Sequence, residues 1–235
     1  MDFPFPREFS GRNFPTSEEI NIGFPPRTQY YVDGDLFDIS LLKCIDLRKA
    51  QCNIRDVENI FHPGDGLVMR PLHITDVNKG ENDVSSNILS FTSYLNAGYL
   101  ELLSQLTEIG NVSFDSFVEQ FRLIQNRTDS YYIVVVEDTT KKIIVATCSL
   151  VLEHKFIHSC GARGRLEDLV VLREYRSRQL GKLLLESLRQ LAKHLRCYKV
   201  SLECKDELVP YYEQFGFQKE EGNSNFLVQR FTPSA

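Results

Sequence analysis

The chain has 235 residues, of which 42% are hydrophobic and 25% are charged, as is ordinary for a soluble globular protein. Its 27 Lys and Arg and 32 Asp and Glu give a net charge of −5, which argues against a general nucleic-acid binder because such domains are usually strongly basic. No stretch approaches the roughly 18 uncharged apolar residues of a membrane helix, and the N-terminus lacks the pattern of a secretory signal. The six cysteines form no C-x-x-C pair. We therefore expect reduced thiols and a cytoplasmic location, with peripheral attachment to intracellular membranes as the alternative.

The N-terminal part of the chain is weakly patterned. Residues 1–26 hold many Pro, Phe and polar residues without a sustained period, which is typical of a flexible extension. Residues 38–49 can form a short helix, and the breaker cluster HPGDG at 62–66 indicates a boundary. We therefore expect a largely flexible extension over 1–62 and one compact domain over 63–235.

From residue 66 onward the apolar pattern sharpens into strands and helices. The expected strands are 66–72, 131–137, 142–153, 165–172, 198–204 and 225–231, and the expected helices are 75–106, 113–124, 180–196 and 208–215. The second and third strands should form a hairpin, because only a short polar turn separates them. The helix over 180–196 is the clearest, since its leucines recur at helical spacing. The order predicts a mixed α/β fold.

A basic loop joins the strand over 165–172 to the helix over 180–196. It contains Arg176 and Arg178 and runs into a helix N-terminus, where free N–H groups and the helix dipole favour a phosphate. Gly181 would let a pyrophosphate approach the backbone closely. Without further context such a loop is more often structural or merely solvated, so both interpretations stay open at this point.

Several blocks, taken in order, carry a resemblance to a known family. The loop RSRQLGK at 176–182 resembles the pyrophosphate loop R/Q-x-x-G-x-G/A of the GNAT acetyltransferases, with Gln179 at the first glycine position and Gly181 at the second. The blocks EHKFIHSC, EDLVV, QLGKLLL, CYKV and YYEQFGF begin at residues 153, 167, 179, 197 and 211. Together they resemble the eukaryotic glucosamine 6-phosphate N-acetyltransferases, from about residue 64 to Phe231.

The resemblance implies the GNAT fold, an α/β (α+β) architecture with a central mixed, mostly antiparallel sheet flanked by helices. It implies transfer of the acetyl group of acetyl-CoA to the amine of D-glucosamine 6-phosphate, by direct attack in a ternary complex, on the route to UDP-N-acetylglucosamine. It also implies no metal, and a homodimer in which each active site takes residues from both subunits. No cysteine lies in a visible Cys-His-acid arrangement, so we expect no covalent acyl-enzyme.

The resemblance assigns cofactor and catalytic roles residue by residue. The cofactor-binding residues are the strand residues Leu169, Val170 and Val171, the loop residues Ser177, Arg178, Gln179, Leu180, Gly181 and Lys182, and Tyr212. The N–H of Leu169 would face the thioester oxygen as an oxyanion donor. Tyr212 would stabilise or protonate the leaving thiolate, and Glu203 would orient the amine. A plainer interpretation of Tyr212 is an aromatic residue that packs a short helix.

The resemblance also implies a set of sugar-binding residues. These are Thr107, Lys155, Phe156, Ile157, His158, Glu167, Asp168, Leu169, Tyr198, Lys199, Glu203 and Arg230. The carboxylates would accept from hydroxyls and the amine, and the Lys, His and Arg residues would bind the phosphate. The alternatives are solvated acids at a strand edge for Glu167 and Asp168 and a helix C-terminal residue without a ligand for Thr107. His154, His158 and Cys160 superficially suggest a metal site, but three mixed ligands on a strand and loop are a weak pattern.

Two segments depart from the family: the N-terminal extension and about eighteen residues, 81–98, that look inserted. The insertion is amphipathic, so we expect an extra helix near the pocket entrance or an exposed loop. Other functions stay open: a GNAT enzyme for another amine, in a protein or a small molecule, and a catalytically silent CoA-binding module. A nucleic-acid module is a third alternative, but the basic run over 163–178 contains three acids and the net charge has the wrong sign.

Overall fold

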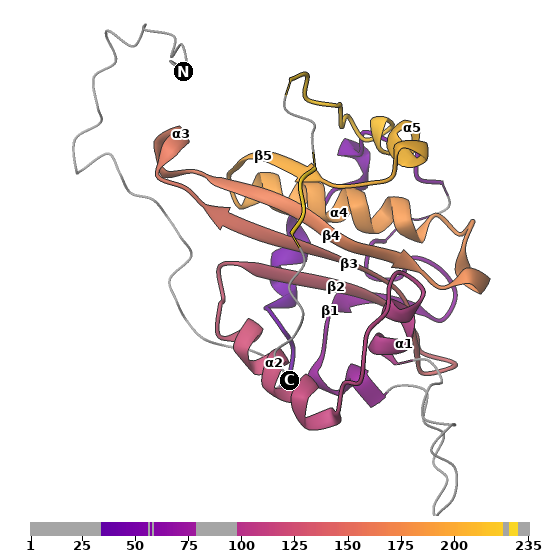
Figure 1. Cartoon of the computed structure of the whole chain (residues 1–235). Coiled ribbons are helices and arrows are strands. Elements are labelled where there is room, and N and C mark those ends of the chain that lie inside the picture. The colour runs from indigo at the N-terminus through magenta and orange to yellow at the C-terminus, as the bar shows by residue number, and fades with distance from the viewer. Residues whose placement is uncertain (1–33, 56, 58, 79–97, 223–225, 230–235) are drawn as a thin grey trace, which may run out of the picture. The chain divides into compact units, whose positions relative to one another are not determined.

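Five strands form one sheet in the computed structural model, which describes residues 34–55, 57, 59–78, 98–222 and 226–229. The strands are β1 (Leu67–Pro71), β2 (Tyr131–Asp138), β3 (Ile143–His154), β4 (Ala162–Val171) and β5 (Cys197–Leu202). They lie side by side in chain order (Figure 1). The first three pairings are antiparallel, and β4 with β5 is parallel. The mixed, mostly antiparallel sheet and the hairpin between β2 and β3 are therefore confirmed.

Helices cover both faces of this sheet. The α-helices are α1 (Tyr99–Ser104), α2 (Phe114–Gln125), α3 (Ile157–Cys160), α4 (Leu180–His194) and α5 (Val209–Glu213), and the 3-10 helices are η1 (Ile39–Cys44), η2 (Leu47–Lys49), η3 (Ile74–Asn78), η4 (Arg173–Tyr175) and η5 (Asp206–Leu208). A Cβ on Gly164 of β4 would lie 3.6 Å from Ala192 of α4 and 3.0 Å from Leu150 of β3, so these residues share the α4 face. Tyr99 of α1 interacts with the Thr147 hydroxyl. Thr147 and Leu150 are an odd number of residues apart on β3, so their side chains point to opposite faces of the sheet. The helix α1 therefore covers the face opposite to α4.

Part of the predicted N-terminal extension belongs to the core. Leu36, Phe37, Leu42 and Ile60 are buried with the sheet and α4, and the described residues from 34 onward belong to one compact unit. Residues on both sides of the boundary expected at 62/63 therefore pack into the same hydrophobic core.

Residues 38–49, expected as one helix, form the two short 3-10 helices η1 and η2. The carboxylates of Asp38 and Asp46 accept from the N–H groups of Ser40 and Arg48. The backbone of Ile45 is extended between the two helices, so a continuous helix cannot form. Each segment instead begins at its own aspartate cap.

Two further expectations need correction. The helix expected over 75–106 is divided into η3 and α1, and residues 79–97, most of the presumed insertion, lie outside the described residues. Of the strand expected over 225–231, residues 226–229 are described, and they lie in no strand. Their apolar side chains raise strand propensity, but a strand forms only where another strand pairs with it.

Val77 and Gly98, which enclose residues 78–97 and so most of the presumed insertion, are in contact. A Cβ on Gly98 would lie 2.4 Å from the carbonyl oxygen of Val77, so these backbones touch and only glycine fits at position 98. A segment whose ends are in contact can be added or removed without moving the elements that flank it.

Candidate active site

The sheet opens beside β4 at the point where β4 and β5 part. Their parallel pairing ends at Leu166 opposite Leu202, while β4 continues to Val171. On the other side, the register with β3 passes from Glu167 to Val170 and skips Asp168 and Leu169. Within the described strands, neither of these two residues has a partner on either side. A substrate can therefore hydrogen-bond to this stretch of β4 as a further strand would.

The skipped residues form a bulge with a left-handed backbone. Asp168 has φ +53, an uncommon conformation for a residue other than glycine that re-aims the residues around it. Desolvation raises the pKa of Asp168, and the charge of Glu167 raises it further. Behind the bulge the thiol of Cys148 lies 3.7 Å from the carbonyl oxygen of Glu167. Burial strongly raises its pKa, so Cys148 stays a neutral thiol.

The loop after β4 has a left-handed backbone at two residues and leads directly into α4. Ser177 and Gln179 have left-handed φ values of +68 and +61. Gln179 caps the fifteen-residue helix α4 without a side-chain bond to its first turn, so the N–H groups of that turn remain available to an anion. A Cβ on Gly181 would lie 3.2 Å from the hydroxyl of Tyr211, so α5 sits against the start of α4.

Tyr212 lies on α5, next to this helix terminus. Its ring packs edge-to-face against Tyr211 and Phe217, as the plainer interpretation expects. Desolvation raises the pKa of Tyr212 to about 12, with further contributions from Cys148 and Cys204. The phenol therefore keeps its proton at any physiological pH and can donate it.

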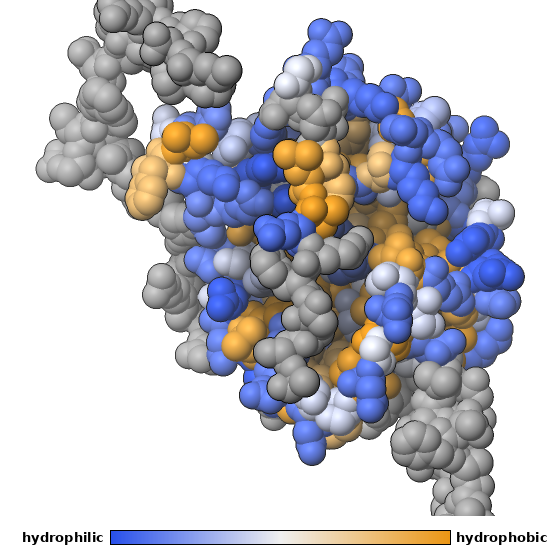
Figure 2. Space-filling model, in the orientation of Figure 1, coloured by the Kyte–Doolittle hydropathy of each residue, from blue (hydrophilic) through white to orange (hydrophobic). Residues whose placement is uncertain are grey.

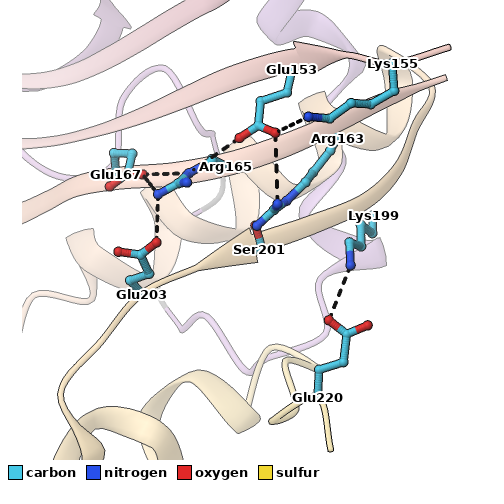
Figure 3. Close-up of polar contacts among 9 residues, drawn as sticks. All are labelled: Glu153, Lys155, Arg163, Arg165, Glu167, Lys199, Ser201, Glu203 and Glu220. Atoms are coloured by element: carbon cyan, nitrogen blue, oxygen red, sulfur yellow. Dashed lines mark hydrogen bonds and ion pairs between the residues drawn. The ribbon is translucent and has the colours of Figure 1, made fainter. Parts of the chain in front are cut away.

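A network of charges joins three strands where β5 ends (Figure 3). Arg165 of β4 donates to one oxygen of Glu167 at 3.0 and 2.8 Å and to Glu203 at 2.8 Å. Glu153 of β3 lies 3.8 Å from the same guanidinium. Desolvation lowers the pKa of Arg165, but the three carboxylates outweigh it and hold the group charged. The arrangement fixes the predicted sugar-site acids Glu167 and Glu203 side by side.

Arg165 and its neighbour Arg163 were not predicted as site residues. Arg163 donates to the hydroxyl of Ser201 at 3.0 and 2.7 Å. A signal for them was present. Residues 163, 165 and 167 alternate with buried residues along β4, and side chains two apart on a strand share a face. The charged triplet RxRxE on one face of a strand thus indicates a polar site as clearly as the acids alone.

Other predicted sugar-binding residues lie far from the bulge. Phe156 and Ile157 are 96% and 63% exposed on the turn before β4, and Figure 2 shows this apolar tip where Figure 1 labels α3. The turn is left-handed at three successive residues, His158 to Cys160, where strand and loop were expected. Because β4 separates this turn from Leu169, the distance within one chain is roughly 20 Å.

The described side chains among those predicted to bind phosphate already have protein partners. Lys155 pairs with Glu153 at 2.8 Å and Lys199 pairs with Glu220 at 3.3 Å. His158 stacks on Tyr198 with the ring centroids 4.1 Å apart. Thr107 is exposed after α1, and Arg230 lies outside the described residues.

An open groove of about 1050 Å³ runs along β5 and connects several of these residues. Its walls include Arg163, Lys199, Glu203 and Tyr212. The groove thus brings Tyr212, predicted to act on the leaving group, and Glu203, predicted to orient the amine, into one cavity whose cations include Arg163 and Lys199.

The described residues contain neither a metal-binding cluster nor a membrane-spanning helix. In this part of the chain, no three His, Cys, Asp or Glu side chains form a group able to hold a metal ion. Across the same ranges, no helix is long and apolar enough to cross a membrane.

Comparison with known proteins places this geometry in a family. Residues 99–217 match the acetyltransferase (GNAT) family model. A Drosophila melanogaster protein named "Probable glucosamine 6-phosphate N-acetyltransferase" is 40% identical over 197 residues, 83% of this chain and 81% of the relative. Glucosamine 6-phosphate N-acetyltransferase 1 of Dictyostelium discoideum is 35% identical over 66% of this chain and 87% of its own length. The crystal structure of the Arabidopsis thaliana glucosamine-6-phosphate N-acetyltransferase superposes with a TM-score of 0.58 at 33% identity, over 70% of this chain and 97% of that one. The chain therefore belongs to the GNAT acetyltransferases, among the relatives that carry the glucosamine 6-phosphate N-acetyltransferase name.

Proposed function

We propose that this protein transfers the acetyl group of acetyl-CoA to the amine of D-glucosamine 6-phosphate, giving N-acetyl-D-glucosamine 6-phosphate and CoA. The observation that carries the proposal is the parting of β4 from β5 at Leu166 and Leu202, next to a left-handed loop at the start of α4. This arrangement fits a pantetheine arm that pairs with β4 and a pyrophosphate at the helix terminus. The names of the relatives support the sugar phosphate as the acceptor.

The proposed chemistry is a direct transfer in a ternary complex. The amine nitrogen attacks the thioester carbonyl carbon, the carbon–sulfur bond breaks, and the amine loses a proton. The backbone N–H of Leu169, in the bulge, is the proposed oxyanion donor. Glu203, held by Arg165, orients the amine, and Tyr212 gives its proton to the departing thiolate. The proton that the amine loses returns to the Tyr212 oxygen through water, so the step closes with the phenol restored. Positioning of the two substrates supplies most of the acceleration.

A homodimer would complete the sugar site. Phe156 and Ile157 are exposed apolar residues, as are Phe226, Leu227 and Val228, which are 60 to 91% exposed. Large exposed apolar side chains that cluster on a surface are typical of interfaces. Within one chain, roughly 20 Å separate the turn at 155–158 from the bulge of β4. In a dimer in which the turn of one subunit reaches the bulge of its partner, the predicted sugar-binding residues would lie in one site. Light scattering of the wild type and of the double variant Phe156→Ser/Ile157→Ser tests this: the wild type should have the mass of a dimer, and a monomeric wild type would contradict it.

The activity is tested by product identification. Acetyl-CoA is incubated with the protein and, in parallel, with D-glucosamine 6-phosphate or with a lysine peptide, and the products are read by mass spectrometry. We expect the sugar phosphate alone to gain an acetyl group, which raises its mass by about 42 units. Acetylation of the peptide alone would assign the enzyme to protein substrates.

A further inference from the structure

Two glutamine side chains, that of the α4 N-cap residue Gln179 and that of Gln190 within α4, hold a segment that is distant in the chain. We name residues 46–55 the strap. At one end, Gln190 accepts from the N–H of Asp46 at 2.8 Å and donates to its carbonyl oxygen at 3.0 Å. At the other end, Gln179 accepts from the N–H of Arg55 at 3.0 Å and donates to its carbonyl oxygen at 2.9 Å. Each carboxamide thus binds both polar groups of one backbone residue, as a neighbouring strand would.

The strap lies against both parts of the proposed cofactor site. Its side chains Cys52 and Ile54 pack on the core. The carboxamide oxygen of Gln51 lies 2.6 Å from where a Cβ on Gly216 would sit, just after α5. One end of the strap therefore contacts the loop at the start of α4, and its middle contacts the chain that follows Tyr212.

Gln179 occupies a backbone position that suits glycine better. Its φ of +61 is left-handed, a conformation in which a side chain such as glutamine is uncommon. The acetyltransferase loop pattern has a glycine at this position. A non-glycine residue stays in such a conformation only when its surroundings hold it there, and the side chain of Gln179 makes two hydrogen bonds to the Arg55 backbone that can do so.

We propose that Gln179 is a positioning residue for acetyl-CoA: by clamping the Arg55 backbone, it fixes the loop 176–182 in the shape that the pyrophosphate requires, and so makes the strap part of the cofactor site. The inference rests on the proposed function, because it assumes that this loop binds the cofactor. It does not require the side chain of Gln179 to touch the cofactor.

Two substitutions distinguish the effect of losing the hydrogen bonds to Arg55 from the effect of relieving backbone strain at position 179. Glycine and asparagine adopt the left-handed conformation more readily than glutamine, but neither can bridge to Arg55, because one lacks the side chain and the other is one methylene shorter. If Gln179 is merely tolerated in a strained position, Gln179→Gly and Gln179→Asn should bind CoA as well as the wild type or better. If the clamp positions the loop, both should bind it more weakly.

The experiment measures CoA binding by calorimetry and the Michaelis constants of both substrates. We expect both variants to raise the Kd of CoA about tenfold, since two hydrogen bonds are lost, with the KM of the amino sugar unchanged. The matched control is Gln190→Ala, which releases the far end of the strap and leaves the loop intact. It should keep the Kd of CoA within about twofold of the wild type, a change that corresponds to less than one ordinary hydrogen bond.

A protease gives a second readout. Arg48 and Lys49 are exposed on the strap, so trypsin should cut there, and saturating CoA should slow the cut in the wild type. In Gln179→Gly the protection by CoA should be lost, because coupling between two sites is reciprocal.

The outcomes distinguish this inference from the function on which it rests. Wild-type protein that binds no CoA would refute the proposed function itself. Wild type that binds CoA, together with a Gln179→Gly variant that binds it equally well, would overturn the positioning role alone. An equal loss of CoA binding in Gln190→Ala would also overturn it, because the effect would then come from a loosened strap and not from the loop.

Discussion

Replacement of Arg165 by methionine should damage the sugar site selectively. The side chain of Arg165 joins Glu167 and Glu203 through three hydrogen bonds of 2.8 to 3.0 Å. Methionine keeps much of the side-chain volume and removes every donor. Glu153, Glu167 and Glu203 would then face one another without the cation between them, and like charges at such distances repel.

The magnitude follows from the exposure of the three side chains. Arg165 is 31% exposed, Glu167 37% and Glu203 46%, so solvent screens these pairs and each hydrogen bond is worth about 1 kcal/mol, well below its buried value. Three such bonds sum to roughly 2–3 kcal/mol, which corresponds to about a 30- to 150-fold change in an equilibrium constant. We expect this change in the KM of D-glucosamine 6-phosphate.

The assay compares steady-state constants for both substrates in three variants. Arg165→Met should raise the KM of the sugar phosphate as calculated and leave the KM of acetyl-CoA unchanged. Arg165→Lys should lie between, because a lysine keeps the charge but lacks the planar fork that reaches two carboxylates. Arg122→Met on α2, which removes an exposed arginine with a 2.8 Å bond to Gln125, is the matched control and should change neither constant. If the sugar KM of Arg165→Met stays within twofold of the wild type, the positioning argument fails.

Three further predictions follow from the described residues. Tyr212→Phe should lower kcat by about 10²- to 10⁴-fold. Because the raised pKa of about 12 keeps this tyrosine protonated, the kcat of the wild type should not fall between about pH 8 and 10. A fall in that range that Tyr212→Phe abolishes would be evidence against Tyr212 as the acid. Arg70→Met should destabilise the fold by about 3–5 kcal/mol in urea unfolding, because Arg70 lies 2.7 Å from the fully buried carboxylate of Asp76 and its loss leaves a buried charge without its cation; a loss below about 1 kcal/mol would contradict this. Deletion of residues 81–97 should leave the melting temperature within about 5 °C of the wild type. Gly98→Ala should lower the melting temperature by more, since a Cβ at position 98 meets the Val77 carbonyl at 2.4 Å. Unfolding of the deletion variant would show that the segment belongs to the fold.

Local patterns predicted the sheet and its principal helix. The hairpin of β2 and β3 follows from two apolar runs around a polar turn, and α4 follows from leucines at helical spacing, six of which are fully buried. Both signals are contained in neighbouring residues, which is why they can be recognised without a structure.

Contacts between distant residues were beyond such patterns. The clamp of Gln179 on Arg55 spans 124 positions, and the strap itself shows no period, because backbone hydrogen bonds to a side-chain amide leave no trace in side-chain polarity. The apolar run at 226–228 was predicted as a strand for the converse reason. Its side chains favour a strand, but pairing depends on a neighbour that a local pattern does not specify.

The candidate site was predicted in part. The loop at 176–182 and the acids of β4 and β5 came from the family resemblance, and the structure adds their geometry. The bulge at Asp168, with φ +53, depends on a register mismatch with β3 and has no sequence signature here, because no glycine marks it. The turn at 155–158 and the bulge lie at opposite ends of β4, so a single chain does not bring all the predicted sugar-binding residues together.

Acetylation of an amino-sugar phosphate is the function that we propose for this chain. The decisive test is thiol release from acetyl-CoA, measured with D-glucosamine 6-phosphate and with unphosphorylated D-glucosamine as the control. We predict rapid release with the phosphorylated sugar and a kcat/KM at least about 100-fold lower with glucosamine, since an unpaired phosphate site loses several charge-assisted hydrogen bonds. Equal rates with both sugars, or no release with either while CoA still binds, would contradict the account.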